Sequence, residues 1–295
     1  MKFNDTQQMF LDHCLIEKNM TPRNYRSIVR HMERLLEYLD TENIRKVNEE
    51  TIREYLSVAS KKGAWSPKTY RTHLQSFSTY FKWCQKRGFV KKNPAEKIEK
   101  PKLPHRLPRC LTKTEIQTVF EFAIQYKWLY RFERTRNLAI LHTFLYTGMR
   151  LNELLHLRII DVNIDSQEIY IHTAKGGKNR IVPIHHQLSS VLRGYIYERN
   201  NREVESKWFF TGIHSDKRLY EKNVLEICRK ISIKSGIKFT PHMLRHTFAR
   251  LVCDADMNLF KLKEILGHSN VSTTQIYLSV SREGIKRSLG SITFL

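Results

Sequence analysis

The chain has 295 residues, with 51 Lys and Arg against 29 Asp and Glu, for a formal net charge of +22. Hydrophobic residues make up 41% and charged residues 27%, which excludes a globally disordered chain. No segment approaches the roughly 20 apolar residues of a membrane span, and the N-terminus lacks the pattern of a secretion signal. A chain of this length predicts two domains.

The positive charge is spread over both halves of the chain. Residues 1–100 carry 20 basic and 12 acidic side chains, and residues 101–295 carry 31 and 17. This distribution favours two domains that both meet a polyanion such as nucleic acid, although a generally basic surface gives the same counts. The five cysteines are widely spaced and form neither a disulfide framework nor a CxxC metal motif, so we expect a reducing, cytoplasmic location.

The first hundred residues predict a four-helix bundle. Thr21 and Ser66 each precede a proline, which is the pattern of an N-cap followed by the first helical residue. Apolar residues recur at helical spacing after both, and residues 4–18 and 49–60 predict two weaker helices. The surface of the last helix is basic, and its candidate DNA-binding residues are Lys68, Arg71, Lys82, Lys86 and Arg87.

A basic connector follows. Residues 98–110 hold three prolines and four Lys or Arg, which favours an extended segment able to follow a phosphate backbone. Thr112 and Glu115 then form a capping box that opens a helix. We therefore predict an N-terminal domain over 1–97, a linker over 98–110 and a second domain over 111–295.

The second domain predicts a mixed α/β unit. Helical patterns cover 112–126 and 134–147, and they return from about residue 186. Between them, strand patterns lie around 158–160, 168–173 and 180–184. The whole chain is thus expected to be mainly α, with a small antiparallel β-sheet.

Two polar motifs stand before and within the strand region. In Thr-Gly-Met-Arg-Leu-Asn-Glu-Leu, Arg150 and Glu153 are three residues apart, so a helix would place them on one face. Taken alone, they suit a structural ion pair. Lys175 lies in the glycine-containing turn 174–179 between two strands, where an isolated lysine is normally just solvated.

Two further motifs lie near the C-terminus. Thr240 caps a helix that places His242 in the first turn, where free N–H groups favour a phosphate, with Arg245 one turn on. His242 and His246 have zinc-ligand spacing, but no third ligand accompanies them, so we expect no metal. The fourth motif, Leu-Gly-His-Ser-Asn-Val-Ser-Thr-Thr-Gln-Ile-Tyr, contains His268 and Tyr277, and alone Tyr277 reads as one aromatic of an apolar stripe.

Together these motifs closely resemble the tyrosine recombinase (phage-integrase-type) family, including its Xer-like members. The matching residues, in order, are Arg150, Glu153, Lys175, the His-Met-Leu-Arg-His box, and His268 nine residues before Tyr277. The N-terminal half matches only in type, as a helical core-binding domain. One departure is Asn152, where the family usually has a smaller residue.

The resemblance implies a mechanism. Tyr277 would attack a DNA phosphodiester, leaving a 3′-phosphotyrosyl bond and a free 5′-hydroxyl. Arg150 and Arg245 would hold the non-bridging oxygens, and Glu153 would orient Arg150 or His242. His242 would act as base, Lys175 as acid for the leaving oxygen, and His268 as a donor to the phosphate. The covalent intermediate retains the bond energy, so we expect no cofactor.

The resemblance also implies partners. We expect a double-stranded recombination site, a dimer on each site, and a homo-tetramer that joins two sites through a Holliday junction, with room for a partner recombinase or an accessory protein. Dimer resolution, integration and excision of DNA remain open. A topoisomerase-like or nicking enzyme, and a non-catalytic DNA-binding relative, are the alternatives.

Overall fold

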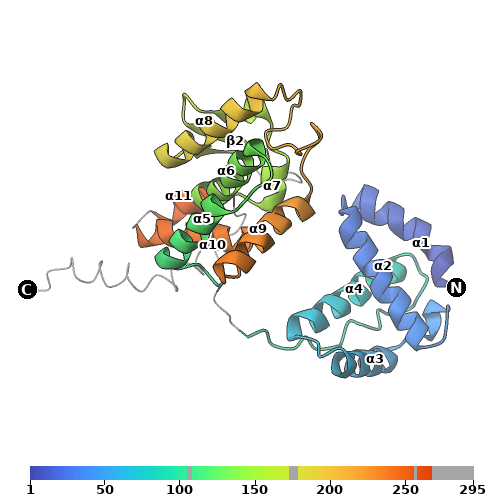
Figure 1. Cartoon of the computed structure of the whole chain (residues 1–295). Helices are drawn as coiled ribbons and strands as arrows, with labels where there is room; N and C mark the ends of the chain where they lie inside the picture. The colour runs from blue at the N-terminus through green and yellow to red at the C-terminus, as the bar shows by residue number, and fades with distance from the viewer. Residues whose placement is uncertain (105–107, 173–178, 256–257, 268–295) are drawn as a thin grey trace, which may run out of the picture. The chain divides into compact units, whose positions relative to one another are not determined.

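The computed structural model describes residues 1–104, 108–172, 179–255 and 258–267. The chain forms two compact units, Met1–His105 and Arg106–Leu295, and the predicted linker spans the point where they divide. Figure 1 shows the first unit in blue to cyan and the second in green to red. Three residues of the predicted site, Lys175, His268 and Tyr277, lie outside the described residues.

The N-terminal unit contains the four helices that the sequence predicts. The elements are α1 (Phe3–Asp12), a π-helical turn (His13–Glu17), α2 (Pro22–Tyr38), a 3-10 turn (Ile44–Lys46), α3 (Glu49–Lys62) and α4 (Pro67–Lys86). The Thr21 and Ser66 side chains cap α2 and α4, accepting hydrogen bonds from the amides of Asn24 and Thr69. Both predicted caps are therefore confirmed.

The core of this unit lies where α2, α3 and α4 pack together. Phe77 and Phe81 of α4 are fully buried, together with Met32 and Leu35 of α2. Burial of these large side chains accounts for the position of α4, whose opposite face stays polar.

The C-terminal unit is built around one buried helix. Its helices are α5 (Lys113–Gln125), α6 (Arg131–Thr147), α7 (Leu151–Leu155), α8 (His186–Asn201), α9 (Glu221–Ser235), α10 (Pro241–Asp254) and α11 (Leu259–Leu266). Helix α6 packs against α5, α8 and α10 and is buried around most of its circumference. A helix enclosed on several sides needs little amphipathicity, and α6 has apolar or buried polar residues on all faces.

The sheet is small and antiparallel, as predicted. Its order is β1 (Val162–Asn163), β2 (Glu168–Ile171) and β3 (Arg180–Pro183), and Ile171 pairs with Arg180. The strand predicted at 158–160 is wrong, because Ile159–Asp161 forms a 3-10 turn. The Asp161 carboxylate accepts hydrogen bonds from the Arg158 amide and guanidinium, which closes the turn.

In the described ranges, no helix is long and apolar enough to cross a membrane. The same residues contain no group of three or more His, Cys, Asp or Glu side chains placed to hold a metal ion. All five cysteines are free thiols.

Candidate active site and DNA-binding groove

Arg150 begins α7 immediately after a sharp turn. Gly148 ends α6 in the left-handed conformation, with φ of +59°, and a Cβ there would lie 2.3 Å from the Phe248 ring. Only glycine fits this position. The turn makes Arg150 the N-cap of α7, and its side chain stays 39% exposed. Arg150 is therefore held by the backbone but can still meet a ligand.

Glu153 binds Arg150 twice, as the sequence spacing predicts. Its carboxylate accepts the Arg150 amide at 2.7 Å and Nη1 at 2.9 Å. The Glu153 side chain is only 7% exposed. Burial alone raises the pKa of Glu153, but the hydrogen bond and charge of Arg180, and then the amide and charge of Arg150, bring that pKa below its usual value. Glu153 is thus a buried carboxylate.

The second arginine on Glu153, Arg180, was not identified from the sequence. It is the first residue of β3, and its Nη1 and Nη2 donate to the two Glu153 oxygens at 2.9 and 2.8 Å. This bidentate pair is buried on both sides. An arginine in an exposed-looking Asn-Arg-Ile-Val segment carries no sequence signal of burial, so only the fold shows its role.

Arg245 lies on α10 and is buried, with 2% of its surface exposed. Its Nη1 donates to the Gly148 carbonyl oxygen at 2.6 Å, and its Nη2 donates to the Leu266 carbonyl oxygen at 2.7 Å. Arg245 and Arg150 are thereby brought to the same turn, 95 residues apart in sequence.

All three arginines donate hydrogen bonds to the C-terminal end of α11. The carbonyl oxygens of Ile265, Leu266 and Gly267 accept hydrogen bonds from Arg180, Arg245 and Arg150, at 2.7, 2.7 and 3.0 Å. Free carbonyls at a helix C-terminus carry partial negative charge, so they hold cations well. His268 follows Gly267 directly in the sequence.

His242 and His246 lie on the same helix as Arg245. The Thr240 side chain caps α10 as predicted, accepting the Met243 amide at 3.2 Å. His242 is exposed in the first turn, and its ring lies 4.8 Å from that of half-buried His246. Burial lowers the pKa of His246 to about 4, helped by His242 and Arg245. His246 is therefore neutral at pH 7.

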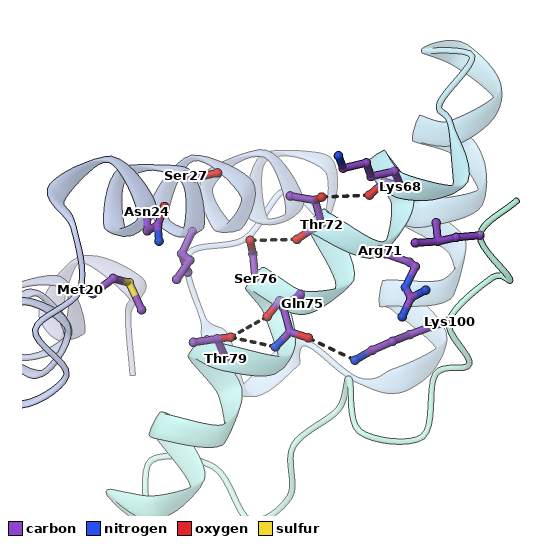
Figure 2. Close-up of a pocket in the computed structure, with 12 residues that line it drawn as sticks. Met20, Asn24, Ser27, Lys68, Arg71, Thr72, Gln75, Ser76, Thr79 and Lys100 are labelled. Atoms are coloured by element: carbon purple, nitrogen blue, oxygen red, sulfur yellow. Dashed lines mark hydrogen bonds between the residues drawn. The ribbon is translucent and has the colours of Figure 1, made fainter. Parts of the chain in front are cut away.

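The N-terminal unit carries a groove of about 490 Å³ along α4. Two of the five predicted DNA-binding residues, Lys68 and Arg71, line it (Figure 2). Figure 2 also shows Lys100, from the predicted linker, donating to Gln75 Oε1 at 3.1 Å. Three basic side chains thus line the groove, together with the polar residues Asn24, Ser27, Thr72, Gln75, Ser76 and Thr79.

The other three predicted DNA-binding residues lie elsewhere on α4 or just after it. Lys82 and Lys86 are exposed but do not line this groove. Arg87 donates to Glu17 Oε1 at 3.1 Å, so its charge is partly offset. The sequence did not identify Lys100 or Gln75 as part of this surface.

Comparison with known proteins agrees with both units. Residues 109–283 match the model of the phage integrase family, and residues 8–88 match that of the phage integrase N-terminal SAM-like domain. A tyrosine recombinase of Pseudothermotoga lettingae is 30% identical over 278 residues, which cover 92% of this chain and 93% of that protein. Tyrosine recombinase XerA of Pyrococcus horikoshii is 30% identical over 243 residues, 81% of this chain and 79% of that protein.

Solved structures share the fold. XerH site-specific recombinase, in a post-cleavage complex with palindromic difH substrate, has a TM-score of 0.77 at 22% identity, covering 97% of this chain and 84% of that chain. A lambda integrase dimer on a COC′ core site has a TM-score of 0.72 at 15% identity, covering 92% of this chain and 97% of that chain. The chain belongs to the phage integrase family of tyrosine recombinases, which confirms the resemblance seen in its motifs.

Proposed function

We propose that this protein cuts and rejoins DNA at a specific site, with Tyr277 as the nucleophile. The observation that carries the proposal is the convergence of Arg150 and Arg245 on the last turn of α11, directly before the His268–Tyr277 segment of the sequence. Two converging guanidinium groups suit a phosphodiester, because the transition state gathers charge on the non-bridging oxygens.

The cleavage step transfers the phosphoryl group from the DNA 5′-oxygen to Tyr277. The Tyr277 oxygen bonds to phosphorus while the bond to the 5′-oxygen breaks, and His242 takes the phenolic proton. Tyrosine has a pKa near 10, so it is a weak nucleophile at pH 7 until this proton leaves. Lys175 gives a proton to the departing 5′-oxygen, and His268 donates a hydrogen bond to the phosphate. Religation by a 5′-hydroxyl reverses each transfer.

The arrangement of charges supports Arg150 as a phosphate ligand. Its side chain is 39% exposed, whereas Arg180 and Glu153 are buried beneath it. Arg245 is more enclosed, and it contributes charge and orientation at the Gly148 turn. The exposed position of His242 in the first turn of α10 is compatible with access to a tyrosine hydroxyl.

DNA is bound by both units in this proposal. In the groove along α4, Lys68, Arg71 and Lys100 would contact phosphates. The amide and hydroxyl side chains of the same groove would contact base edges. We propose a dimer on each site and a tetramer that joins two sites through a Holliday junction. The assembly leaves room for a partner recombinase or an accessory protein, and it serves dimer resolution, integration or excision.

Covalent trapping tests the proposal. Labelled duplexes from the DNA flanking this protein's own gene are nicked next to each candidate position, so that a short 5′-hydroxyl strand diffuses away after cleavage. Wild type and Tyr277→Phe are compared on a denaturing gel. We expect a slow-migrating band with wild type alone. Binding without a covalent band, on a fragment shown to hold the site, would favour a non-catalytic DNA-binding protein.

A second assay separates recombination from relaxation. Plasmids with two copies of the mapped site, and plasmids with none, are incubated with the wild-type protein. A recombinase rearranges only the two-site plasmid. Relaxation of the plasmid without a site, with no rearranged product, would indicate a topoisomerase-like enzyme.

A further inference from the structure

Glu153 forms hydrogen bonds to two arginine side chains, and the geometry of the two pairs differs. Arg180 engages both carboxylate oxygens and also donates from Nε to the Ile265 carbonyl oxygen at 2.7 Å. Arg150 reaches Glu153 through only one side-chain nitrogen and turns Nη2 toward the Gly267 carbonyl oxygen. The two side chains also differ in exposure, at 7% for Arg180 and 39% for Arg150. Arg180 therefore faces inward, and Arg150 faces the ligand side.

The charges show why two arginines are needed. If the buried Glu153 carboxylate paired with Arg150 alone, it would cancel the positive charge with which Arg150 binds a phosphate. With Arg180 added, the group of Arg150, Glu153 and Arg180 carries a net charge of +1. Arg180 also occupies both oxygens of Glu153, which limits the hold of this carboxylate on Arg150.

Arg180 also joins three elements of the fold. It pairs with Ile171 across β2 and β3, binds Glu153 of α7, and holds the last turn of α11 through Ile265. Gly267 packs on it so closely that a Cβ there would lie 2.8 Å from Arg180 Nη1. A shift of Arg180 would therefore move the α11 terminus and Arg150 together.

We propose that Arg180 is a positioning residue for DNA cleavage: it neutralises Glu153, so that Arg150 is left to bind the phosphate, and it fixes the end of α11. This inference rests on the proposed function, since it assigns a role within that site. Arg180 itself does not touch the DNA.

The test measures single-turnover cleavage of the nicked duplex by full-length variants, with DNA affinity and melting temperature measured alongside. We expect Arg180→Gln to cleave roughly 100-fold more slowly, because small displacements of a ligand to the reacting group have effects of this size. Its affinity for DNA should change less than about threefold. Arg180→Lys keeps the positive charge but cannot donate two parallel hydrogen bonds to Glu153. Its cleavage rate should therefore lie between those of wild type and Arg180→Gln.

A double variant separates this role from a merely structural one. In Glu153→Gln with Arg180→Gln, no carboxylate competes for Arg150, so cleavage should be at least about tenfold faster than in Arg180→Gln alone. Loss of two buried contacts that only stabilise the fold would instead make the double variant slower. The matched control is Arg193→Gln, which removes an exposed ion pair with Asp165 in the same unit.

Several outcomes would overturn the inference. These are a wild-type rate in Arg180→Gln, a double variant no faster than Arg180→Gln, or loss of the melting transition in both Arg180→Gln and Arg180→Lys. Each of these leaves the proposed function intact, because wild type still cleaves. A wild type that forms no covalent complex on its bound site overturns the proposed function, and this inference with it.

Discussion

Arg245 donates from Nη1 to the Gly148 carbonyl oxygen at 2.6 Å, which attaches the second arginine of the site to the turn that presents the first. The same guanidinium reaches the Leu266 carbonyl oxygen through Nη2. One planar group thus joins the end of α6 to the end of α11, and Arg150 follows Gly148 by two residues. The two arginines are therefore positioned as a unit.

Arg245→Lys should cleave the nicked duplex roughly 100- to 1,000-fold more slowly than wild type, because a lysine cannot reproduce the fork that bonds both carbonyls. DNA binding should be retained. The measurement is single-turnover cleavage at saturating DNA. Arg250→Lys is the matched control, since Arg250 lies on the same helix in a partly exposed pair with Asp254. A rate for Arg245→Lys within threefold of wild type would show that cleavage does not require the two guanidinium hydrogen bonds.

Gly148→Ala should destabilise the protein by roughly 2–4 kcal/mol, because a Cβ would strain the backbone and would also collide with Phe248. Gly236 offers a control in the same unit, since its φ is +71° but nothing lies within 4 Å of a Cβ. Gly236→Ala should cost only about 1 kcal/mol of backbone strain. Urea denaturation of both variants measures the difference, and equal losses would show that the Phe248 contact is relieved easily.

Lys175→Ala should slow cleavage by roughly 100- to 10,000-fold, the usual range for loss of a general acid. The defect should largely disappear on a duplex in which sulfur replaces the 5′-bridging oxygen. A thiol has a pKa near 8.5, so the thiolate leaves without a proton. Tyr277→Phe serves as the control, because no change of leaving group can restore it. An equal defect on both duplexes would assign Lys175 another role.

Lys68→Ala and Arg71→Ala should each reduce the salt dependence of DNA binding by about one unit in the slope of log K against log salt, since each removes a phosphate contact. Arg87→Ala should reduce it less, because Arg87 already pairs with Glu17. Anisotropy titrations at several NaCl concentrations provide the slopes. If the three variants change the slope equally, Arg87 also contacts a phosphate, and its ion pair with Glu17 does not offset its charge in the DNA complex.

Acid should weaken the N-terminal unit through His73. Its buried ring stacks between those of His31 and Trp65, at 3.8 and 4.0 Å. Burial lowers the pKa of His73 to about 4, helped by His31 and Arg34. Between pH 4 and the ordinary value near 6.5, the unfolded chain binds a proton that the folded chain excludes. Stability from this group is therefore complete above about pH 6.5 and falls as the pH drops toward 4.

The loss from this group should amount to about 2–3 kcal/mol across that range. His73→Phe keeps the ring stack but removes the titration, so its free energy of unfolding should fall less between pH 7 and pH 4.5. Urea denaturation followed by tryptophan fluorescence makes the comparison, with the full chain in both cases. His246, in the other unit, also has a lowered pKa, but its contribution is the same in wild type and His73→Phe and cancels in the comparison. An identical fall in wild type and variant would contradict the prediction.

Local chemistry made much of the fold predictable. The caps at Thr21, Ser66 and Thr240 depend on one side chain and an amide three residues on, so the sequence contains the whole interaction. The Arg150–Glu153 pair is predictable for the same reason. The strand expected at 158–160 was wrong because Asp161 competes for the Arg158 amide and bends the chain into a turn.

The sequence by itself determined the helices, the family and the residues that are candidates for chemistry, because those signals lie in short segments. Only the tertiary structure decided which of those residues meet. Arg180 is 27 residues from Glu153 and 85 from Ile265, and no periodicity links them. The attraction of Arg150 and Arg180 to the Glu153 carboxylate, and of all three guanidinium groups to the carbonyls at the end of α11, exists only once packing has brought β3, α7, α10 and α11 together.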